Sequence, residues 1–351
     1  MSWIVTSQTS RVDSAVDFSV SVVVPVYNAA RFVTEAVESA LAQPETAEVI
    51  LVEDASPDNS LAVCRTLTEQ YDQVRLYQHP GGVNRGAGPS RNLGMEKSTR
   101  GFIAFLDADD YYLPGRFSTA GSVFNTNPDC DAVYDAVGIH FEDERARQRW
   151  LASNMAVVQM TTMTRHVPPE DLFGVLTKGG SGHIHLDGLV IRRSILQRSG
   201  FMNEEIADTL HEDTDFILKL AAVGRMLPAG IDKPVSMRRV HAENRVSAPR
   251  SAASVYRDQM RLRVATYRWC RKAGLREHQR LSFKRMLTTC EREKPLSRAV
   301  LRRAGRSAQA ALRLLSWPVD CADVLREGQY WHELGSSCWG IIRNDLLRLK
   351  G

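Results

Sequence analysis

The sequence lacks the patterns that mark disulfide-rich, zinc-binding or membrane-spanning proteins. Its six cysteines are scattered, and no two of them form a C-x-x-C pair. This spacing argues against a structural zinc site or a disulfide framework and favours reduced thiols. No apolar run approaches the roughly 20 residues that cross a bilayer. Residues 1–18 lack the basic start and apolar centre of a signal peptide. We therefore expect a globular protein of the cytoplasm.

Two common nucleotide-binding motifs are also absent. The sequence has no P-loop, and no G-x-G-x-x-G follows its first apolar run, which argues against a dehydrogenase. There is no internal repeat and no low-complexity segment. A chain of 351 residues is long enough for one large domain with an appendage, or for two domains.

The charges are distributed unevenly along the chain. Residues 248–351 hold 22 Lys/Arg against 9 Asp/Glu, so the first 247 residues carry −9 of a total that is only +4. The basic part has a helical pattern, and its arginines form two groups, one over residues 257–272 and one over residues 298–313. A basic amphipathic helix can lie on an anionic membrane surface. A solvated helical face that packs on the rest of the protein is the alternative. No recognition motif supports nucleic-acid binding.

Apolar runs and helical patterns alternate through the first hundred residues. Strands are expected at 19–25, 49–52, 74–78 and 102–106, and helices at 31–41, 61–71 and 89–98. Further on, a strand is expected at 131–137. Such alternation predicts an α/β fold with a parallel sheet and right-handed crossovers.

The central stretch of the sequence is residues 101–110. Five apolar residues lead into Asp107, Asp109 and Asp110, which reads as a buried strand followed by an acidic turn. Ligands of open α/β sheets bind beyond the carboxyl ends of the strands. Crowded carboxylates repel one another unless a cation offsets them, and Mg²⁺ bound to phosphate oxygens would do so. A solvated turn or a helix N-cap is the alternative.

The strand at 49–52 also ends in acids, Glu53 and Asp54, and a glycine-rich, arginine-containing segment at 81–92 opens the next helix. The glycines allow close approach of the backbone to a ligand, and Pro89 suits a first helical turn. Two acidic strand ends and this helix start would gather at one edge of the sheet. That geometry is typical of a nucleotide site.

Several linked motifs resemble the family 2 glycosyltransferases. They occur in the expected order: Val22–Asn28, Val52–Asp58, Arg91-Asn92-x-Gly94 and Phe105–Asp110. The resemblance covers roughly residues 20–247 and implies the GT-A fold, a mostly parallel central sheet flanked by helices. The implied organisation is a loose arm at 1–18, a GT-A domain at 19–247 and a basic helical extension at 248–351. The domain would divide into a nucleotide-binding half (19–110) and an acceptor half (111–247).

The resemblance also implies roles for individual residues of the donor site. Nucleotide contacts would come from the loop at Pro25 and Tyr27, from Asp54 at the base, from Asp107 at the ribose or sugar, and from Arg91 near the phosphates or sugar. Each has a simpler alternative, because Tyr27 could be a core residue, Arg91 a surface charge and Asp54 a cap.

The same resemblance implies a metal and a catalytic base. Asp109 and His241, the latter in the H-x-x-x-x-x-S tail that ends at Ser247, would bind Mn²⁺ or Mg²⁺ beside the diphosphate. The Glu212-Asp213 pair would open a helix, and Asp213 would be the base of an inverting displacement, with Glu212 as the second choice. Carboxylates at a helix N-terminus are favoured by the helix dipole in any case, which is the structural alternative.

A glycine run with two histidines, residues 179–187, precedes a strand-to-helix block. Relatives tend to place acceptor-facing residues here, so His183, His185 and Asp187 are acceptor-site candidates. A plain mobile loop is the alternative reading.

Together these features predict a metal-dependent inverting glycosyltransferase with a nucleotide-sugar donor. UDP-sugar suits Tyr27 and Asp54, although thymine and guanine nucleotides stay open. The acceptor would be a saccharide or a lipid-linked glycan of polysaccharide or glycoconjugate assembly, and the enzyme would work in the cytoplasm, at the inner membrane face if the basic helices bind lipid. A degenerate nucleotide-binding module is the alternative; a sugar-1-phosphate nucleotidyltransferase is weaker, because no basic glycine-rich loop follows the first strand.

Overall fold

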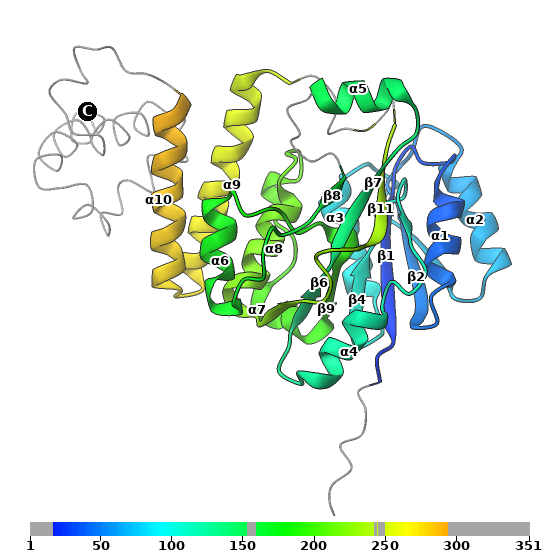
Figure 1. Cartoon of the computed structure of the whole chain (residues 1–351). Coiled ribbons are helices and arrows are strands. Elements are labelled where there is room, and N and C mark those ends of the chain that lie inside the picture. The colour runs from blue at the N-terminus through cyan, green and yellow to red at the C-terminus, as the bar shows by residue number, and fades with distance from the viewer. Residues whose placement is uncertain (1–16, 153–158, 242–243, 245–249, 294–351) are drawn as a thin grey trace, which may run out of the picture.

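A computed structural model of the chain describes residues 17–152, 159–241, 244 and 250–293. Figure 1 shows a central sheet with helices on both of its faces and a helical pair at one side. The expected α/β architecture is therefore confirmed. Part of the expected N-terminal arm and the basic group at 298–313 lie outside the described residues.

The main sheet has seven strands in the order β10-β6-β9-β4-β1-β2-β3. Its strands are β1 (Val20–Val26), β2 (Thr46–Glu53), β3 (Val74–Gln78), β4 (Phe102–Phe105), β6 (Ala132–Tyr134), β9 (Leu189–Arg192) and β10 (Met226–Pro228). Strands β3, β2, β1 and β4 are parallel to one another, and β9 runs antiparallel to both β4 and β6. The first four strands expected from the sequence are all present.

The two faces of this sheet bury different cores, because neighbouring residues of a strand point to opposite faces. Val22 and Val24 pack with helices α1 (Val33–Leu41), α2 (Ser60–Gln70) and α4 (Ser118–Thr126). Val23 lies on the other face, with helices α3 (Ala87–Lys97), α6 (Pro169–Lys178) and α8 (Glu212–Val223). A Cβ atom on Gly94 of α3 would lie only 2.3 Å from Val23 Cγ1, so glycine lets α3 pack tightly on β1.

A second, four-stranded sheet was not expected from the sequence. Its order is β5-β11-β7-β8, with β5 (Tyr111–Tyr112), β7 (Ala136–Phe141), β8 (Met160–Thr161) and β11 (Pro234–Val240). Helix α5 (Glu144–Ala152) packs on β7 and β11. Short helical turns lie at Leu186–Gly188, Arg193–Ile195 and Glu204–Ile206, and α7 covers Leu196–Ser199.

The single strand expected at 131–137 was wrong in its extent. It divides at Asp135 into β6 and β7, which belong to different sheets. The Asp135 backbone N–H donates to Gly188 O (2.9 Å), and its carboxylate accepts a bond from Arg116 Nη1 (3.2 Å). These two buried contacts, with residues distant in the sequence, hold the chain at the point where it passes from one sheet to the other.

The described part of the basic region consists of helices α9 (Ala252–Lys272) and α10 (Arg276–Glu293). Helix α9 packs on α8, and α10 packs on α9 and α6, as Figure 1 shows. The apolar face of α9 is buried, whereas Arg257, Arg268 and Lys272 are exposed. Within the described residues, no helix is both long and apolar enough to cross a membrane.

Candidate active site

The loops that follow β1 and β2 meet at the carboxyl edge of the main sheet. Val26, the last residue of β1, is in register with Glu53, the last residue of β2. Asn28 and Ala55 follow them with φ of 53° and 55°, a left-handed conformation that is uncommon for residues other than glycine. The Asn28 backbone N–H donates to Ser56 Oγ (3.2 Å). Such strained backbone clusters at functional sites when the surroundings hold it in place.

Asp54 is buried and organises the glycine-rich loop before α3. Its two carboxylate oxygens accept bonds from the backbone N–H groups of Arg85 (2.7 Å) and Gly86 (2.8 Å), and its backbone oxygen accepts one from Asn84 Nδ2 (2.9 Å). Asp54 therefore does not merely cap its own turn; it connects the loop after β2 to the loop before α3. The expected contact of Asp54 with a nucleotide base stays a prediction.

Tyr27 is 53% exposed, so it is not a core residue, and its ring is available to a ligand at this edge. Pro25 is part of β1 and is half-buried, in register with Val52. Val83, in the loop that Asp54 holds, is also exposed. An exposed aromatic ring and an exposed aliphatic side chain on neighbouring loops suit the apolar faces of a nucleobase.

Arg91 lies inside the site and is not a surface charge. Its Nη2 donates to Asp107 Oδ1 (2.5 Å), and its Nη1 is 3.8 Å from Glu212 Oε1. Burial disfavours the charged guanidinium, but Asp107 and Glu212 outweigh it and raise the pKa of Arg91. Burial likewise opposes ionisation of Asp107, while Arg91 and His185 lower the pKa of this carboxyl. Arg91 therefore links the acidic turn after β4 to the start of α8.

Asp109 and His241 lie together, although 132 residues separate them in the sequence. His241 Nε2 is 3.0 Å from Asp109 Oδ2, which also accepts a bond from Asn244 Nδ2 (3.1 Å). Arg239 fixes the same turn, because its Nε donates to Asp109 O (3.0 Å) and its backbone N–H to Asp110 Oδ1 (2.7 Å). The His241 ring packs against Phe32 at a centroid distance of 4.6 Å.

A second group, of carboxylates and one histidine, includes residues of the same turn. One ligand atom each from Asp107, Asp110 and His185 lie within 4.8 Å of one another. Asp187 is fully buried, and its Oδ2 has no hydrogen-bond partner among the described residues. Burial first, and then Asp187 and Asp109, raise the pKa of Asp110. Crowded carboxylates of this kind fit a hard divalent cation such as Mg²⁺ or Mn²⁺, which prefers oxygen ligands.

Asp213 stands at the N-terminus of α8, next to Glu212. It is half-buried, and its Oδ1 accepts a bond from the Thr214 backbone N–H (2.5 Å). Acidic residues are favoured in the first turn of a helix by the helix dipole. Glu212 is more deeply buried and lies beside Arg91. Of the two acids, Asp213 forms no ion pair within the described part of the chain.

The acceptor candidates divide into two groups. His185 and Asp187 join the acidic group, with His185 Nδ1 3.7 Å from Asp187 Oδ2. His183 is exposed, and its backbone N–H donates to Thr162 O (3.1 Å); no described contact ties its side chain to the acids. Asn244 and Arg239 were not singled out from the sequence. Only their position close to His241 in the sequence could have indicated that they contact the acidic turn.

Comparisons with known proteins agree with this arrangement. Residues 21–200 match the family model described as Glycosyl transferase family 2. An uncharacterized glycosyltransferase of Nostoc sp. is 28% identical over 241 residues, which cover 67% of this chain and 69% of the relative. The minor teichoic acid biosynthesis protein GgaB of Bacillus subtilis is 31% identical over 137 residues, 38% of this chain but only 15% of GgaB.

The fold is also similar to solved structures. The crystal structure of S. aureus TarS 1-349 in complex with UDP-GlcNAc superposes with a TM-score of 0.57 at 18% identity, over 84% of this chain and 79% of that one. This likeness supports the GT-A fold. The family match extends over half of the sequence and includes the acidic turn and its supporting strands. The chain therefore belongs to glycosyl transferase family 2 and is a glycosyltransferase.

Proposed function

We propose that this glycosyltransferase is metal-dependent and inverting, and that it moves a sugar from a nucleotide-diphosphate donor to a hydroxyl of a glycan or lipid-linked acceptor. A UDP-sugar is the proposed donor. The supporting observation is the convergence, at one sheet edge, of Asp109 with His241 and of Arg91 with both Asp107 and Glu212. Polysaccharide or glycoconjugate assembly at the cytoplasmic side of a membrane is the proposed setting.

The donor would bind across the loops after β1, β2 and β3. Tyr27 would contact the base, and the loop held by Asp54 would lie against it, with Asp107 toward the ribose or sugar. Arg91 is already paired with two carboxylates. Its part would be to hold Asp107 and Glu212 in place beside the donor. The UDP-GlcNAc complex of TarS, a protein of similar fold, supports a uridine nucleotide.

Asp109 and His241 would hold the metal ion, with Asp107 beside them. Asp109 is the better ligand than Asp110, because its carboxylate is about one-third exposed, whereas Asp110 is buried and bonded to the Arg239 backbone. The ion would supply positive charge that stabilises the departing diphosphate. Asp110, His185 and Asp187 form the alternative ligand group with Asp107.

Asp213 would act as the base. Its carboxylate takes the proton of the acceptor hydroxyl while the acceptor oxygen forms a bond to the sugar C1. The bond from C1 to the diphosphate oxygen breaks on the opposite face, so the anomeric configuration inverts. Glu212 is less suited to this step because it lies against Arg91. Alignment of acceptor and donor supplies a large part of the rate.

Turnover of nucleotide sugars tests this proposal. Release of nucleoside diphosphate would be measured for UDP-, GDP-, dTDP- and CDP-sugars, with Mn²⁺, with Mg²⁺ and with EDTA. We expect one nucleotide class to turn over, and EDTA to abolish the reaction. Asp109→Asn should lose metal-dependent turnover, while Asp110→Asn should retain more of it. Metal-independent turnover, or equal losses in the two variants, would contradict the ligand assignment.

A further inference from the structure

We propose that Glu204 is a positioning residue that couples the donor loop, residues 81–86, to the catalytic base. The coupling would pass through the base segment, residues 202–211, which leads into α8 and Asp213. This inference rests on the proposed function, because it assumes that the donor binds against this loop and that Asp213 is the base. It adds that the base is held in place from the donor side of the site.

The carboxylate of Glu204 contacts the donor loop and α3 with separate oxygen atoms. Its Oε2 lies 2.7 Å from Arg85 Nη2, and its Oε1 accepts a bond from Asn92 Nδ2 (3.2 Å). The backbone of Arg85 is fixed as well, because its N–H donates to Asp54 Oδ1 (2.7 Å). Glu204 therefore joins the base segment to two residues that lie 119 and 112 positions earlier in the sequence.

Asn92 anchors the beginning of the base segment independently of Glu204. Its side chain is buried, its Oδ1 accepts a bond from the Met202 backbone N–H (2.9 Å), and its Nδ2 donates to Met202 O (3.0 Å). By contrast, the side chains of Arg85 and Glu204 are 48% and 44% exposed. An exposed ion pair contributes little to folding stability. The pair is therefore a contact that can form or break while the segment stays folded.

Hydrogen bonds continue from Glu204 to the start of α8. Glu204 opens a short helical turn, in which Ile206 O accepts bonds from the Thr209 backbone N–H (2.9 Å) and from Thr209 Oγ1 (2.7 Å). Thr209 Oγ1 in turn accepts a bond from the backbone N–H of His211 (3.2 Å), which directly precedes α8. A displacement of Glu204 would therefore reach the helical turn that carries the base.

The glycines at the start of α3 lie against the same segment. A Cβ atom on Gly86 would be 3.6 Å from Ala207 O, and one on Gly88 would be 3.2 Å from Glu212 Cγ. Because no side chain on these glycines separates the donor loop from the base segment, a shift of one would displace the other.

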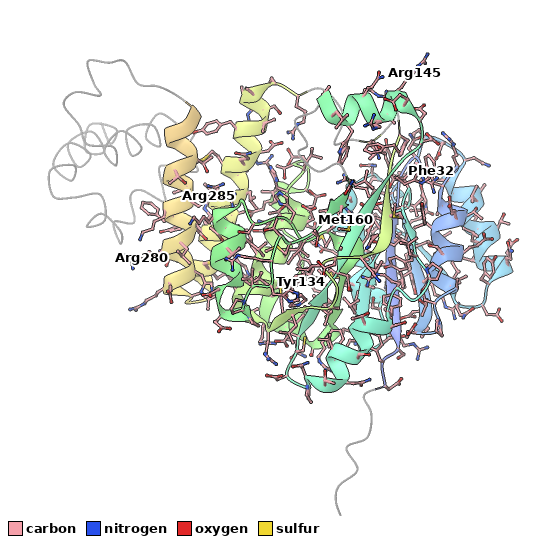
Figure 2. The ribbon with its side chains drawn as sticks, viewed as in Figure 1. Phe32, Tyr134, Arg145, Met160, Arg280 and Arg285 are labelled. Atoms are coloured by element: carbon pink, nitrogen blue, oxygen red, sulfur yellow. The ribbon has the colours of Figure 1, made fainter. Side chains whose placement is uncertain are left out.

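Helix α8 is held in the core behind its first turn. Phe216 and Leu220 are fully buried, and Asp215 accepts a bond from Thr266 Oγ1 of α9 (3.1 Å). Figure 2 shows side chains filling the space between the main sheet and the helices α8 and α9. This region, where α8 packs on α9, is the proposed acceptor end of the molecule. The position of Asp213 there depends on the segment that precedes α8.

This geometry links donor binding to the base. A donor that binds against the donor loop would hold Arg85 in place, and Arg85 would hold Glu204 and the turn that follows it. The base would then be fully positioned only when the donor is present. Such positioning matters for the rate, because a misplacement of about 1 Å can slow a reaction about 100-fold.

Hydrogen exchange of the full chain, with saturating UDP and Mn²⁺ as the probe, tests this coupling. In the wild type, we expect UDP to slow exchange of the amides of residues 203–211 by about fivefold or more. Glu204→Gln keeps an oxygen for Asn92 but loses the charge that pairs with Arg85, so this protection should disappear. Its UDP affinity should stay within about twofold of the wild type. Glu205→Gln, at an exposed acid of the same turn, is the matched control and should keep the protection.

Turnover of the UDP-sugar that the wild type uses gives a second readout. In Glu204→Gln, kcat should fall about tenfold while the KM for the donor changes little. The melting temperature should stay within about 3 °C of the wild type, because the ion pair is exposed. Arg85→Gln should remove the same protection. The double variant should lose no more than either single variant, because both substitutions break one contact.

The possible results separate this inference from the proposed function. UDP that binds the wild type without protecting residues 203–211 would overturn the coupling. Protection that persists in Glu204→Gln, or that is lost equally in Glu205→Gln, would overturn it too, as would additive losses in the double variant. A wild type that binds no UDP would instead overturn the proposed donor, and this inference with it.

Discussion

The proposed donor edge and the proposed acceptor end of this protein differ in how their charged groups are paired. At the donor edge, Asp54 is bonded to two backbone N–H groups and Asp107 to Arg91. At the acceptor end, His211 Nε2 and Arg263 Nε are buried without hydrogen-bond partners in the described part of the chain. The first site is preorganised before ligand arrives. At the second, these two buried nitrogen atoms have no partner among the described residues.

This contrast matches the different ligands that the two ends are proposed to bind. Donor sugars that share one nucleotide present the same base, pentose and phosphates, so a fixed frame of carboxylates would serve all of them. Acceptors differ in shape and charge between enzymes, and fold alone does not identify them. The identity of the acceptor therefore does not follow from the family match, which ends at residue 200.

The largest effect should come from the base. Asp213→Asn keeps the size of the side chain but cannot accept a proton, so we expect turnover to fall by about 10²–10⁴-fold. UDP affinity should stay within about twofold, since the donor frame is untouched. Steady-state rates and calorimetry on the same protein check both expectations. A variant with full turnover would remove Asp213 from the mechanism.

A second prediction concerns the buried acid between the two sheets. Burial, against the opposing effect of Arg116, raises the pKa of Asp135 to about 6 from a usual 3.8. The folded state therefore favours the protonated acid, and its contribution to stability is complete below pH 4 and lost as the pH rises through 6. Relative to Asp135→Asn, the wild type should lose about 2 kcal/mol between pH 4 and 7. Urea unfolding of both proteins across this range measures the difference.

The opposite result for Asp135 would contradict this prediction. A difference in unfolding free energy that does not change between pH 4 and 7 would mean that Arg116 keeps the carboxylate ionised throughout. Burial would then not be the dominant influence on the pKa of Asp135.

The smallest effect should come from the loop bridge at the donor edge. Asp54→Asn replaces one acceptor oxygen by an amide that faces a backbone N–H, which should cost about 2 kcal/mol of unfolding free energy. UDP affinity should fall about tenfold as the 81–86 loop loosens. Asp72→Asn, at an exposed aspartate, is the control. Equal stability and affinity in the two variants would show that Asp54 does not organise the loop.

The donor edge could be predicted from the sequence because it follows from local patterns. Apolar runs fix the parallel strands, and their ends bring Asp54 and Asp107 to one edge without any knowledge of side-chain packing. The division of residues 131–137 between two sheets could not be predicted in this way. It depends on Asp135 contacting Arg116 and Gly188, which lie 19 and 53 positions away.

The acceptor end shows the same limit. Asp213 was identifiable from its neighbour Glu212 and the helix that follows, but the packing of α8 against α9 was not. Helical periodicity indicates that residues 252–272 form a helix, and not which helix it contacts. Asn244, which bonds Asp109, was within a recognised tail but carried no signal of its own.

The central claim is that the acidic edge binds a nucleotide diphosphate with a metal ion. Calorimetric titration of UDP, GDP, dTDP and CDP, with and without Mn²⁺, into the wild type and Asp109→Ala tests it directly. We predict that one nucleotide, UDP, binds tightly, that binding requires Mn²⁺, and that Asp109→Ala abolishes the metal-dependent part. Binding that is absent for all four nucleotides, or that is unaffected by metal and by Asp109→Ala, would contradict the claim.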